Sequence, residues 1–313
     1  MKRLSLRNER GQSMVITLVF VTVLIAIAGA VIDVGAWYRA HRTMQATADA
    51  SALAGAQELP LSTSAAAAQA LDYAKRNQGG VTPEDVQITS SLIPNDTIKV
   101  TARIPAAGVF TKLVGIDSVT ARATAKARVG GLGSAKWAAP IGVDYLHDDL
   151  HCAPGPPLVC DPEFNKATEI TFDRTGPGAF RLLNIDGSHG GTGPQDIGEW
   201  IRRGLDGYMP VQKWYYSDPG IKPNSSHVKE ALEDRLGVGK EILIPIYTET
   251  RAQGAGFEYY VVGWVGWVTT NFDIRGVKDV SIFGHFTQII WEGIQSESGT
   301  DDGTGARAVS LIE

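Results

Sequence analysis

An apolar run near the N-terminus constrains this chain more than any other feature. No charged residue occurs from Gly11 to Ile32, and from Met14 onward nearly every side chain in the run is apolar. This length matches the roughly 20 residues that a helix needs to cross the hydrocarbon core of a bilayer. The run therefore predicts a transmembrane helix, with the lipid bilayer as one partner of the chain.

Charges on the two sides of the run predict its orientation. The charged residues among positions 1–12 are basic apart from Glu9. The positive-inside tendency therefore keeps this tail in the cytoplasm and puts everything after Asp33 outside the membrane. The whole chain has a net charge of −5, so the outer part is acidic and lacks the basic face of a nucleic-acid-binding protein.

A cleaved secretory signal is the alternative to a membrane anchor. Basic residues, an apolar stretch of about fifteen residues and the small residues Ala28-Gly29-Ala30 would form such a signal. Cleavage after Ala30 would release a secreted binding or adhesion protein. The apolar run continues past this site, however, and no helix breaker occurs before Pro60. These two features favour a helix that stays in the membrane.

The helical pattern continues beyond the predicted membrane span. Residues 36–59 are rich in Ala, Gln, Met, Leu and Arg, most of which are strong helix formers. One transmembrane and extended helix over residues 13–60 would be about 70 Å long, more than twice the thickness of the bilayer core. Its outer half must therefore lean on another part of the chain or on a partner.

Small residues form two stripes on the outer half of this helix. Ala46, Ala50 and Ala54 form the first stripe, and the alanines at 48, 52 and 56 form the second. Small side chains let two helix backbones approach closely. The stripes predict contacts with neighbouring helices in an oligomer or with other membrane proteins; they would equally suit a helix that covers its own domain.

Asp33 is the acid at the outer end of the apolar run. A charge costs less near the membrane interface than at the bilayer centre, and this is the explanation we expect. A pair with Arg39, with Arg42 or with a partner protein is the alternative. Because a partner contact is one of these alternatives, Asp33 is also a candidate residue for a contact between helices.

The N-terminal residues resemble a known family. Arg10-Gly11-Gln12, the apolar run, Asp33-Val34-Gly35 and the stretch from Ala48 to Ala56 together resemble the start of the TadE/TadG-like proteins of Flp pilus assembly. Later segments such as Ile282 to Phe286 are loosely similar to TadG-like extracytoplasmic regions. The resemblance implies a non-enzymatic, single-pass component of a tight-adherence (Tad) secretion system. Its first helix would be related to type IV pseudopilins, and its partners would be other pilus-assembly or pseudopilin-like membrane proteins.

The resemblance also bears on processing. Pilin-type precursors are cut after a glycine and carry a glutamate five residues into the mature chain. Gly11 and Gln12 form the candidate processing site here, but Ile16 occupies the position of the glutamate. The resemblance therefore implies an envelope component more than a fibre subunit.

Beyond the long helix, the patterns predict an α+β fold. Residues 61–130 indicate a small pilin-like α+β module, the glycine-rich residues 131–135 indicate a linker, and residues 136–313 indicate an extracytoplasmic β-rich domain. The module is expected to contain helices at 64–76 and 109–114 and strands at 86–92, 97–104 and 118–129. The β-rich domain is expected to contain helices at 195–203 and 226–236 and strands at 169–173, 180–185, 241–248, 257–272 and 280–291.

Two local features refine the β-rich domain. Pro245 stands inside a strand pattern, and this predicts either an edge position or a bulge. Trp264 and Trp267 lie among valines on opposite faces of another strand, where most of the aromatic rings are expected to be core rather than a ligand surface.

Cys152 and Cys160 are the only cysteines. Their position outside the membrane favours a local disulfide. The alternative is a metal site in which Cys152 joins a neighbouring run of imidazole and carboxylate groups, although no recognised spacing supports it. The residues of that alternative are His147, Asp148, Asp149 and His151.

The glycine-rich segment from Asp186 to Gly193 is expected to be a flexible loop. It lacks the ending of a phosphate-binding loop, and Gly190 stands where an adhesion-type metal motif would need a serine. Ser188 beside His189 does not make a hydrolase triad, because sequence neighbours on such a loop lack the required geometry. We therefore predict no catalytic, cofactor-binding or metal-binding residue and no enzymatic activity.

Overall fold

The computed structural model describes residues 10–153, 159–172, 180–217, 223–237, 239–253, 256–276, 279–296 and 303–312. Residues 1–9 of the predicted cytoplasmic tail, and Asp173 at the end of one predicted strand, lie outside this set. Contacts divide the chain into two compact units. The first unit comprises Met1–Thr89, Thr97–Ala127 and Leu311–Glu313, and the second comprises Ser90–Asp96 and Arg128–Ser310.

The first unit is built on helix α1 (Arg10–Ala56), which joins the apolar run and the alanine-rich segment into one element. Helix α2 (Thr63–Arg76) follows it, and the Ser62 hydroxyl caps α2 by accepting a 3.1 Å hydrogen bond from the backbone N–H of Ala65. The buried positions of α2 are the alanines at 66, 70 and 74. Because these small residues share one face, the backbone of α2 can lie close to α1, which it contacts.

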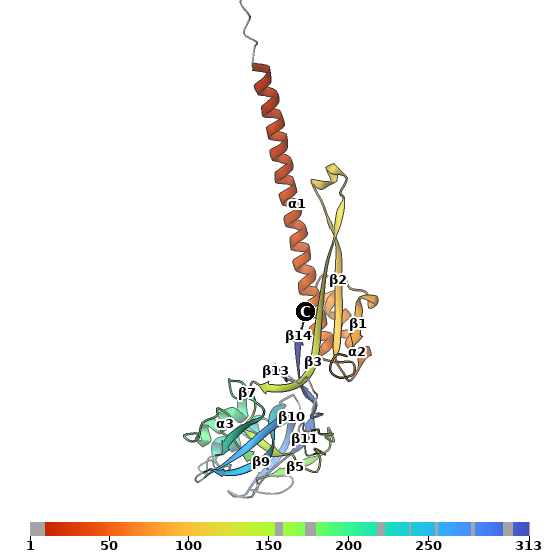
Figure 1. The fold of residues 1–313 in the computed structure, drawn as a ribbon. Helices are drawn as coiled ribbons and strands as arrows, with labels where there is room; N and C mark the ends of the chain where they lie inside the picture. The colour runs from red at the N-terminus through yellow and green to blue at the C-terminus, as the bar shows by residue number, and fades with distance from the viewer. Residues whose placement is uncertain are drawn as a thin grey trace, which may run out of the picture. The chain divides into compact units, whose positions relative to one another are not determined.

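A long β-hairpin runs beside α1 in the same unit (Figure 1). Its strands are β2 (Thr97–Ala107) and β3 (Ser118–Ala135), and the short strand β1 (Val86–Thr89) pairs antiparallel with β2. The 3-10 helix η1 (Pro83–Asp85) precedes β1, and η2 (Thr111–Val114) lies between β2 and β3. Along the first-unit part of β3 the alternate residues at 121, 123, 125 and 127 are buried alanines, as expected for a strand with one covered face.

The second unit contains a sheet with the strand order β5-β11-β10-β9-β4-β6, in which β8 also pairs with β10. Strands β4 and β9 are parallel, with Val143 opposite Ile246, and β10 is antiparallel to its neighbours β9 and β11. The strands are β4 (Ile141–Asp144), β5 (Thr168–Thr171), β6 (Phe180–Leu182), β8 (Lys213–Ser217), β9 (Ile242–Gln253), β10 (Gly256–Ile274) and β11 (Val280–Thr287).

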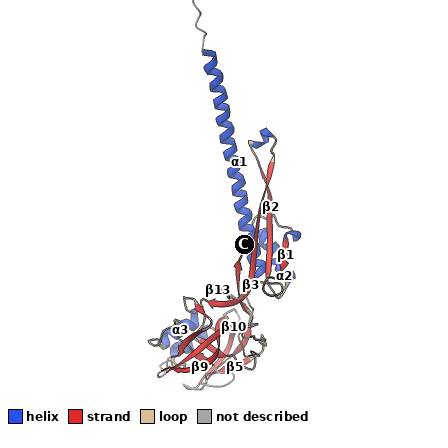
Figure 2. Cartoon of the chain, viewed as in Figure 1, coloured by secondary structure: helices blue, strands red, loops and turns tan. Residues whose placement is uncertain are grey.

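Two helices and several short strands complete the second unit, in which strands predominate (Figure 2). Helices α3 and α4 contact each other, and their buried apolar residues join the same core cluster as Trp267. Trp264 belongs to a second cluster. The elements are α3 (Pro194–Arg203), α4 (Ser226–Asp234), β7 (Met209–Pro210), β12 (Ile289–Ile290), β13 (Gly293–Gln295) and β14 (Ala306–Leu311).

The α+β fold predicted from the sequence is confirmed, and the two helices predicted at 195–203 and 226–236 occur as α3 and α4. The predicted linker at 131–135 is wrong, because these residues belong to β3. Ser134 pairs with Pro210 of β7, and Ala135 pairs with Gly293 of β13. Strands β7 and β13 pair with backbone groups of this segment, which in a flexible linker would form hydrogen bonds with water instead.

Strand β9 lies between β10 and β4, so the edge position considered for the proline-containing strand is wrong. Pro245 is opposite Trp264, and the register of the β9–β10 pair shifts between Val261 and Gly263. An irregularity of the strand pairing therefore lies beside Pro245, in agreement with the predicted bulge. A proline lacks the N–H that a regular ladder uses, and such an irregularity is where a sheet tolerates it.

Candidate functional site

Helix α1 carries the predicted processing and interface residues. Gly11 and Gln12 lie in its first turn. From Ser13 to Val34 the helix exposes every residue except Gly29 and Asp33, which are buried. By length and composition, α1 is suited to cross a membrane. Its two buried positions lie four residues apart, so they share one face of an otherwise exposed apolar rod.

The Asp33 carboxylate binds the end of the β2–β3 hairpin. Oδ1 accepts a 2.9 Å hydrogen bond from the backbone N–H of Val109. Oδ2 accepts bonds from the N–H groups of Phe110 at 2.9 Å and Thr111 at 2.7 Å. The Asp33 residue has no exposed surface. A buried carboxylate is costly unless it is hydrogen-bonded, and three donors aimed at it provide such bonds.

The hairpin tip, defined as residues 108–117, is shaped to present these donors. The N–H of Gly108 donates to the carbonyl of Asp117 at 2.9 Å and closes the base of the tip. Within it, the N–H of Ile116 donates to the carbonyl of Thr111 at 3.0 Å. Gly115 ends η2 in the left-handed region with φ 86°, a conformation that glycine adopts without strain. The consecutive N–H groups at the start of η2 therefore face α1 together.

Gly29 forms the second half of the contact. A Cβ atom placed on Gly29 would lie 2.5 Å from Cγ and 2.7 Å from Cβ of Phe110. These are atoms near the Phe110 backbone, which cannot move aside as the end of a flexible side chain can. Glycine at this position therefore lets the hairpin tip approach the helix one turn below Asp33.

The structure places the partner of Asp33 within its own chain. Arg39 and Arg42 are exposed, and the carboxylate bonds to the backbone of residues 109–111 instead. Sequence reasoning missed this contact because backbone donors carry no side-chain signature. The available signal was the combination of Gly29 and Asp33, one turn apart, with a turn-forming segment after a predicted strand.

The same face of α1 stays in contact with the unit further along the helix. The His41 imidazole Nδ1 lies 2.9 Å from the carbonyl oxygen of Arg122 on β3. Met44 has no exposed surface. Ser51 is also fully buried, and its hydroxyl donates to the carbonyl of Thr47 at 2.7 Å. The His41 ring and the Ser51 hydroxyl thus have partners, as polar groups at a packed face usually do, whereas the buried Trp37 Nε1 has no partner among the described residues.

The two alanine stripes differ in their surroundings. Residues 48, 52 and 56 have no exposed surface, so this stripe covers the first unit. Ala46 is exposed, Ala50 is half-buried and Ala54 is 6% exposed. A Cβ on Gly55 would lie 2.8 Å from the carbonyl oxygen of Ala66, so α1 and α2 approach closely there. Of the first stripe, only the end nearest the apolar run, at Ala46, is exposed.

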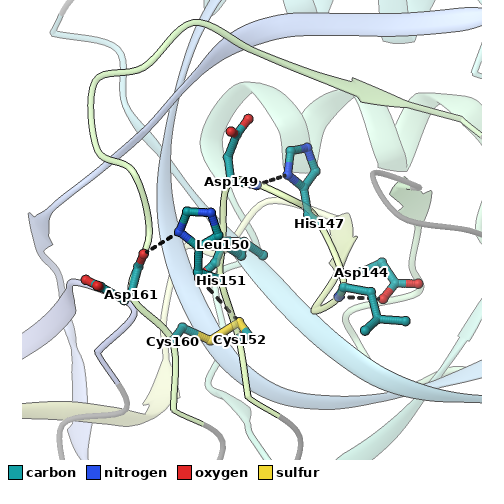
Figure 3. The surroundings of a disulfide bond; sticks show 9 residues. Asp144, His147, Asp149, Leu150, His151, Cys152, Cys160 and Asp161 are labelled. Carbon is teal, nitrogen blue, oxygen red and sulfur yellow. Dashed lines mark hydrogen bonds between the residues drawn. A yellow bond between two sulfur atoms is a disulfide. The ribbon is translucent and has the colours of Figure 1, made fainter.

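Cys152 and Cys160 form the predicted disulfide (Figure 3). The bond joins two segments beside Leu150, which is fully buried. The N–H of Asp161 donates to the carbonyl of Leu150 at 3.2 Å. The disulfide therefore fastens a loop whose base is already held by backbone bonds to the core of the second unit.

The alternative metal-binding residues do not converge on one point. His147 Nδ1 accepts a 3.1 Å bond from the N–H of Asp149, and Cys152 is used by the disulfide. The Asp149 carboxylate lies 2.7 Å from Lys166 Nζ and accepts a 2.6 Å bond from Thr168. Burial raises the pKa of Asp149, but these two partners outweigh it and lower that pKa overall. No metal-ready cluster of three or more His, Cys, Asp or Glu occurs among the described residues.

The Asp186–Gly193 loop is tied down by local bonds. Asp186 Oδ1 accepts a 2.9 Å bond from the N–H of Ser188, and the Ser188 hydroxyl lies 3.2 Å from that of Thr192. The His189 ring stacks on Tyr216 at 5.4 Å, and its Nε2 lies 3.7 Å from the buried Glu258 carboxylate. The Ser188 hydroxyl and the His189 ring thus have different neighbours.

Both tryptophans of β10 are core residues, as predicted, with no exposed surface on either. They enter the two different clusters named above. Trp267 Nε1 donates to the Thr269 hydroxyl at 3.1 Å, and the indole ring meets Phe286 edge-on at 5.1 Å. The buried N–H of Trp267 thus has a partner, as is usual for a core tryptophan, whereas that of Trp264 has none among the described residues.

Removing the disulfide is expected to destabilise the second unit by about 2.5 kcal/mol, the chain-entropy value for so short a loop. The change is Cys152→Ser with Cys160→Ser, and the measurement is thermal unfolding of the detergent-solubilised chain. Wild-type protein treated with a reductant should show the same decrease in the free energy of unfolding. An unchanged unfolding transition in the double variant would contradict the prediction.

Comparison with protein families matches residues 11–58 to the Flp pilus-assembly TadE/G-like family (Tad). The matched segment lies almost wholly in α1 and includes both Gly29 and Asp33. Neither the curated proteins nor the solved structures yielded a match to the chain. The family match and the apolar helix together fit a membrane-anchored pilus component.

Proposed function

We propose that this protein is a non-enzymatic, single-pass membrane component of a Tad-type Flp pilus assembly or secretion apparatus. One observation carries the proposal: the helix that is long and apolar enough to cross a membrane is the same helix that the family match covers. Residues 1–12 would remain in the cytoplasm of a bacterial cell, and the rest of the chain after Asp33 would lie outside. The disulfide suits an oxidising compartment outside the cytoplasm.

The contacts of α1 favour an anchor that is retained over one that is cleaved after Ala30. Cleavage after Ala30 would remove Gly29. The close approach of Gly29 to Phe110 would be lost with it. Asp33 would come to lie near a new chain terminus although three backbone groups bind it. Cleavage would thus cut through a contact that the fold makes across the end of the apolar run.

Partners in the membrane would meet the exposed faces of α1. The helix exposes its apolar side chains around most of its circumference from Ser13 to Val34. Ala46 continues this exposed surface beyond Asp33. Neighbouring pilus-assembly or pseudopilin-like helices would pack here, since small residues permit close backbone approach. Assembly through α1 and presentation of the second unit outside the cell are the two roles we assign.

Complementation separates the anchored component from a released adhesion protein. In a strain lacking the protein, the full chain is expected to restore Flp pili. A version in which residues 1–35 are replaced by a cleavable signal peptide is expected to be exported but to leave the strain without pili. Pili restored by the released version would favour the secreted alternative, and pili in the deletion strain itself would contradict a role in assembly.

A further inference from the structure

The hairpin tip has an exposed apolar surface that the proposed anchor does not explain. Leu113 is 87% exposed and Val114 is 76% exposed, and they stand next to each other in η2. Val109 at 68% and Ile116 at 45% add to the same ten-residue tip. Exposed apolar side chains grouped in this way usually mark a site of interaction.

The place of the tip on α1 indicates what covers this surface. Asp33 and Gly29 hold the tip against the last two turns of the apolar run. At 1.5 Å per residue, Gly29 lies about 5 Å before the end of that run at Ile32. If residues 13–32 cross the bilayer, the tip lies beside the helix at the level of the outer leaflet. The apolar surface of the tip therefore continues that of the membrane span.

The backbone of the tip is suited to such an environment. Lipid offers no partner for backbone polar groups, so a segment that enters it must satisfy them internally. The N–H groups of Val109, Phe110 and Thr111 bind Asp33. Those of residues 108, 113, 115 and 116 bind carbonyls within the tip. The Asp33 carboxylate thus satisfies three donors that an isolated hairpin end would leave open.

The charges of the tip fit a lipid headgroup. Lys112 is exposed between the apolar residues, and the acidic Asp117 lies at the base of the tip. A lysine at the membrane interface can extend its ammonium to lipid phosphates while its methylene chain stays in the apolar layer. Exposed apolar side chains beside a lysine are therefore compatible with a position at the membrane interface.

We infer that the hairpin tip inserts Leu113 and Val114 into the outer leaflet, as a second membrane contact beside α1. This inference rests on the proposed membrane anchor. The tip and the helix bind each other through Asp33, so together they would fix the orientation of the first unit on the bilayer. A single helix would leave the unit free to rotate about the helix axis.

Depth-dependent fluorescence quenching tests this contact. The full chain carrying Leu113→Cys is labelled with the fluorophore NBD under non-reducing conditions, where the native cysteines stay paired. It is reconstituted in phosphatidylcholine–phosphatidylglycerol vesicles with nitroxide-labelled lipids. Val21→Cys in the middle of the run and Gln87→Cys, exposed on β1, are the matched labels. We expect shallow nitroxides to quench the label at 113 several-fold more strongly than the label at 87, and deep nitroxides to quench the label at 21.

The three labels distinguish the possible failures. A label at 113 that lipid nitroxides do not quench, while the label at 21 is quenched, overturns the inference and leaves the anchor intact. If the label at 113 is not quenched by lipid nitroxides and is also shielded from aqueous iodide, a protein covers the tip instead of lipid, and the inference fails. A label at 21 that is not quenched by lipid overturns both the anchor and the inference.

Discussion

Asp33→Ala is expected to release the hairpin tip from α1, with backbone amides of residues 109–111 exchanging with solvent roughly 100-fold faster. The substitution removes the acceptor of three charge-assisted hydrogen bonds. Hydrogen bonds to charged groups contribute about 1.5–3 kcal/mol each and do not add fully. We therefore expect a total of about 3 kcal/mol, which corresponds to about two powers of ten in the opening equilibrium. The measurement is hydrogen–deuterium exchange of the chain in lipid nanodiscs.

Two further variants make this result specific. Asp33→Asn keeps the shape of the side chain and one acceptor oxygen, so its exchange rates should lie between those of the wild type and of Asp33→Ala. Asp49→Ala removes a half-buried acid from the same helix whose Oδ1 accepts a bond from Gln45, and it should leave residues 109–111 unchanged. Equal exchange rates in Asp33→Ala and wild type would show that the carboxylate does not hold the tip.

Trp267→Ala is expected to destabilise the second unit by about 3–5 kcal/mol, the usual cost of removing a large aromatic side chain from a core. Trp267 has no exposed surface, and its ring packs against Phe286. A Cβ on Gly284 of the neighbouring strand would lie 2.7 Å from the indole, so the ring fills its space closely. Denaturant unfolding followed by near-ultraviolet circular dichroism of the detergent-solubilised chain would measure the loss.

Trp214→Ala provides the matched control for this prediction. Trp214 lies on β8, is half-buried and packs against Tyr260 at 5.2 Å and Arg251 at 4.1 Å. Because less of its surface is removed from water, its loss should destabilise the unit clearly less than the loss of Trp267. Similar unfolding free energies for the two variants would mean that Trp267 is not a central core residue.

The extended helix and the two strands β2 and β3 follow from local sequence patterns, although the predicted hairpin joined 86–92 to 97–104 and not β2 to β3. The absence of a helix breaker before Pro60 predicted one long helix, and α1 ends at Ala56, near that boundary. Alternating alanines predicted a strand from Ser118 onward, and β3 begins there. These elements were predictable because their period and their composition agree with the structure that they adopt.

The features that sequence reasoning missed depend on distant pairing. Strands β4 and β14 are short, and each is completed by partners far away in the chain. The glycine-rich segment predicted as a linker becomes strand because β7 and β13 pair with it. The partners of Asp33 are backbone groups of residues 76–78 positions away. Side-chain patterns near Asp33 could indicate an unusual charge but not the loop that binds it.

The contact at Asp33 holds the first unit against α1. A helix that ended in a flexible segment would tether the first unit without orienting it. Here the helix continues without a break from the apolar run into the first unit, and the hairpin returns to bind its face at Asp33 and Gly29. The apolar run is therefore part of the folded first unit.

The most direct test of a retained membrane anchor is the N-terminal sequence of the chain isolated from cells, determined separately for the membrane and the soluble fractions. We expect a membrane-bound chain that resists carbonate extraction and whose N-terminus lies at Gln12 or before it. A soluble chain that begins at Val31 would contradict this expectation, because both the apolar run and the contact between Gly29 and the hairpin tip would then be lost.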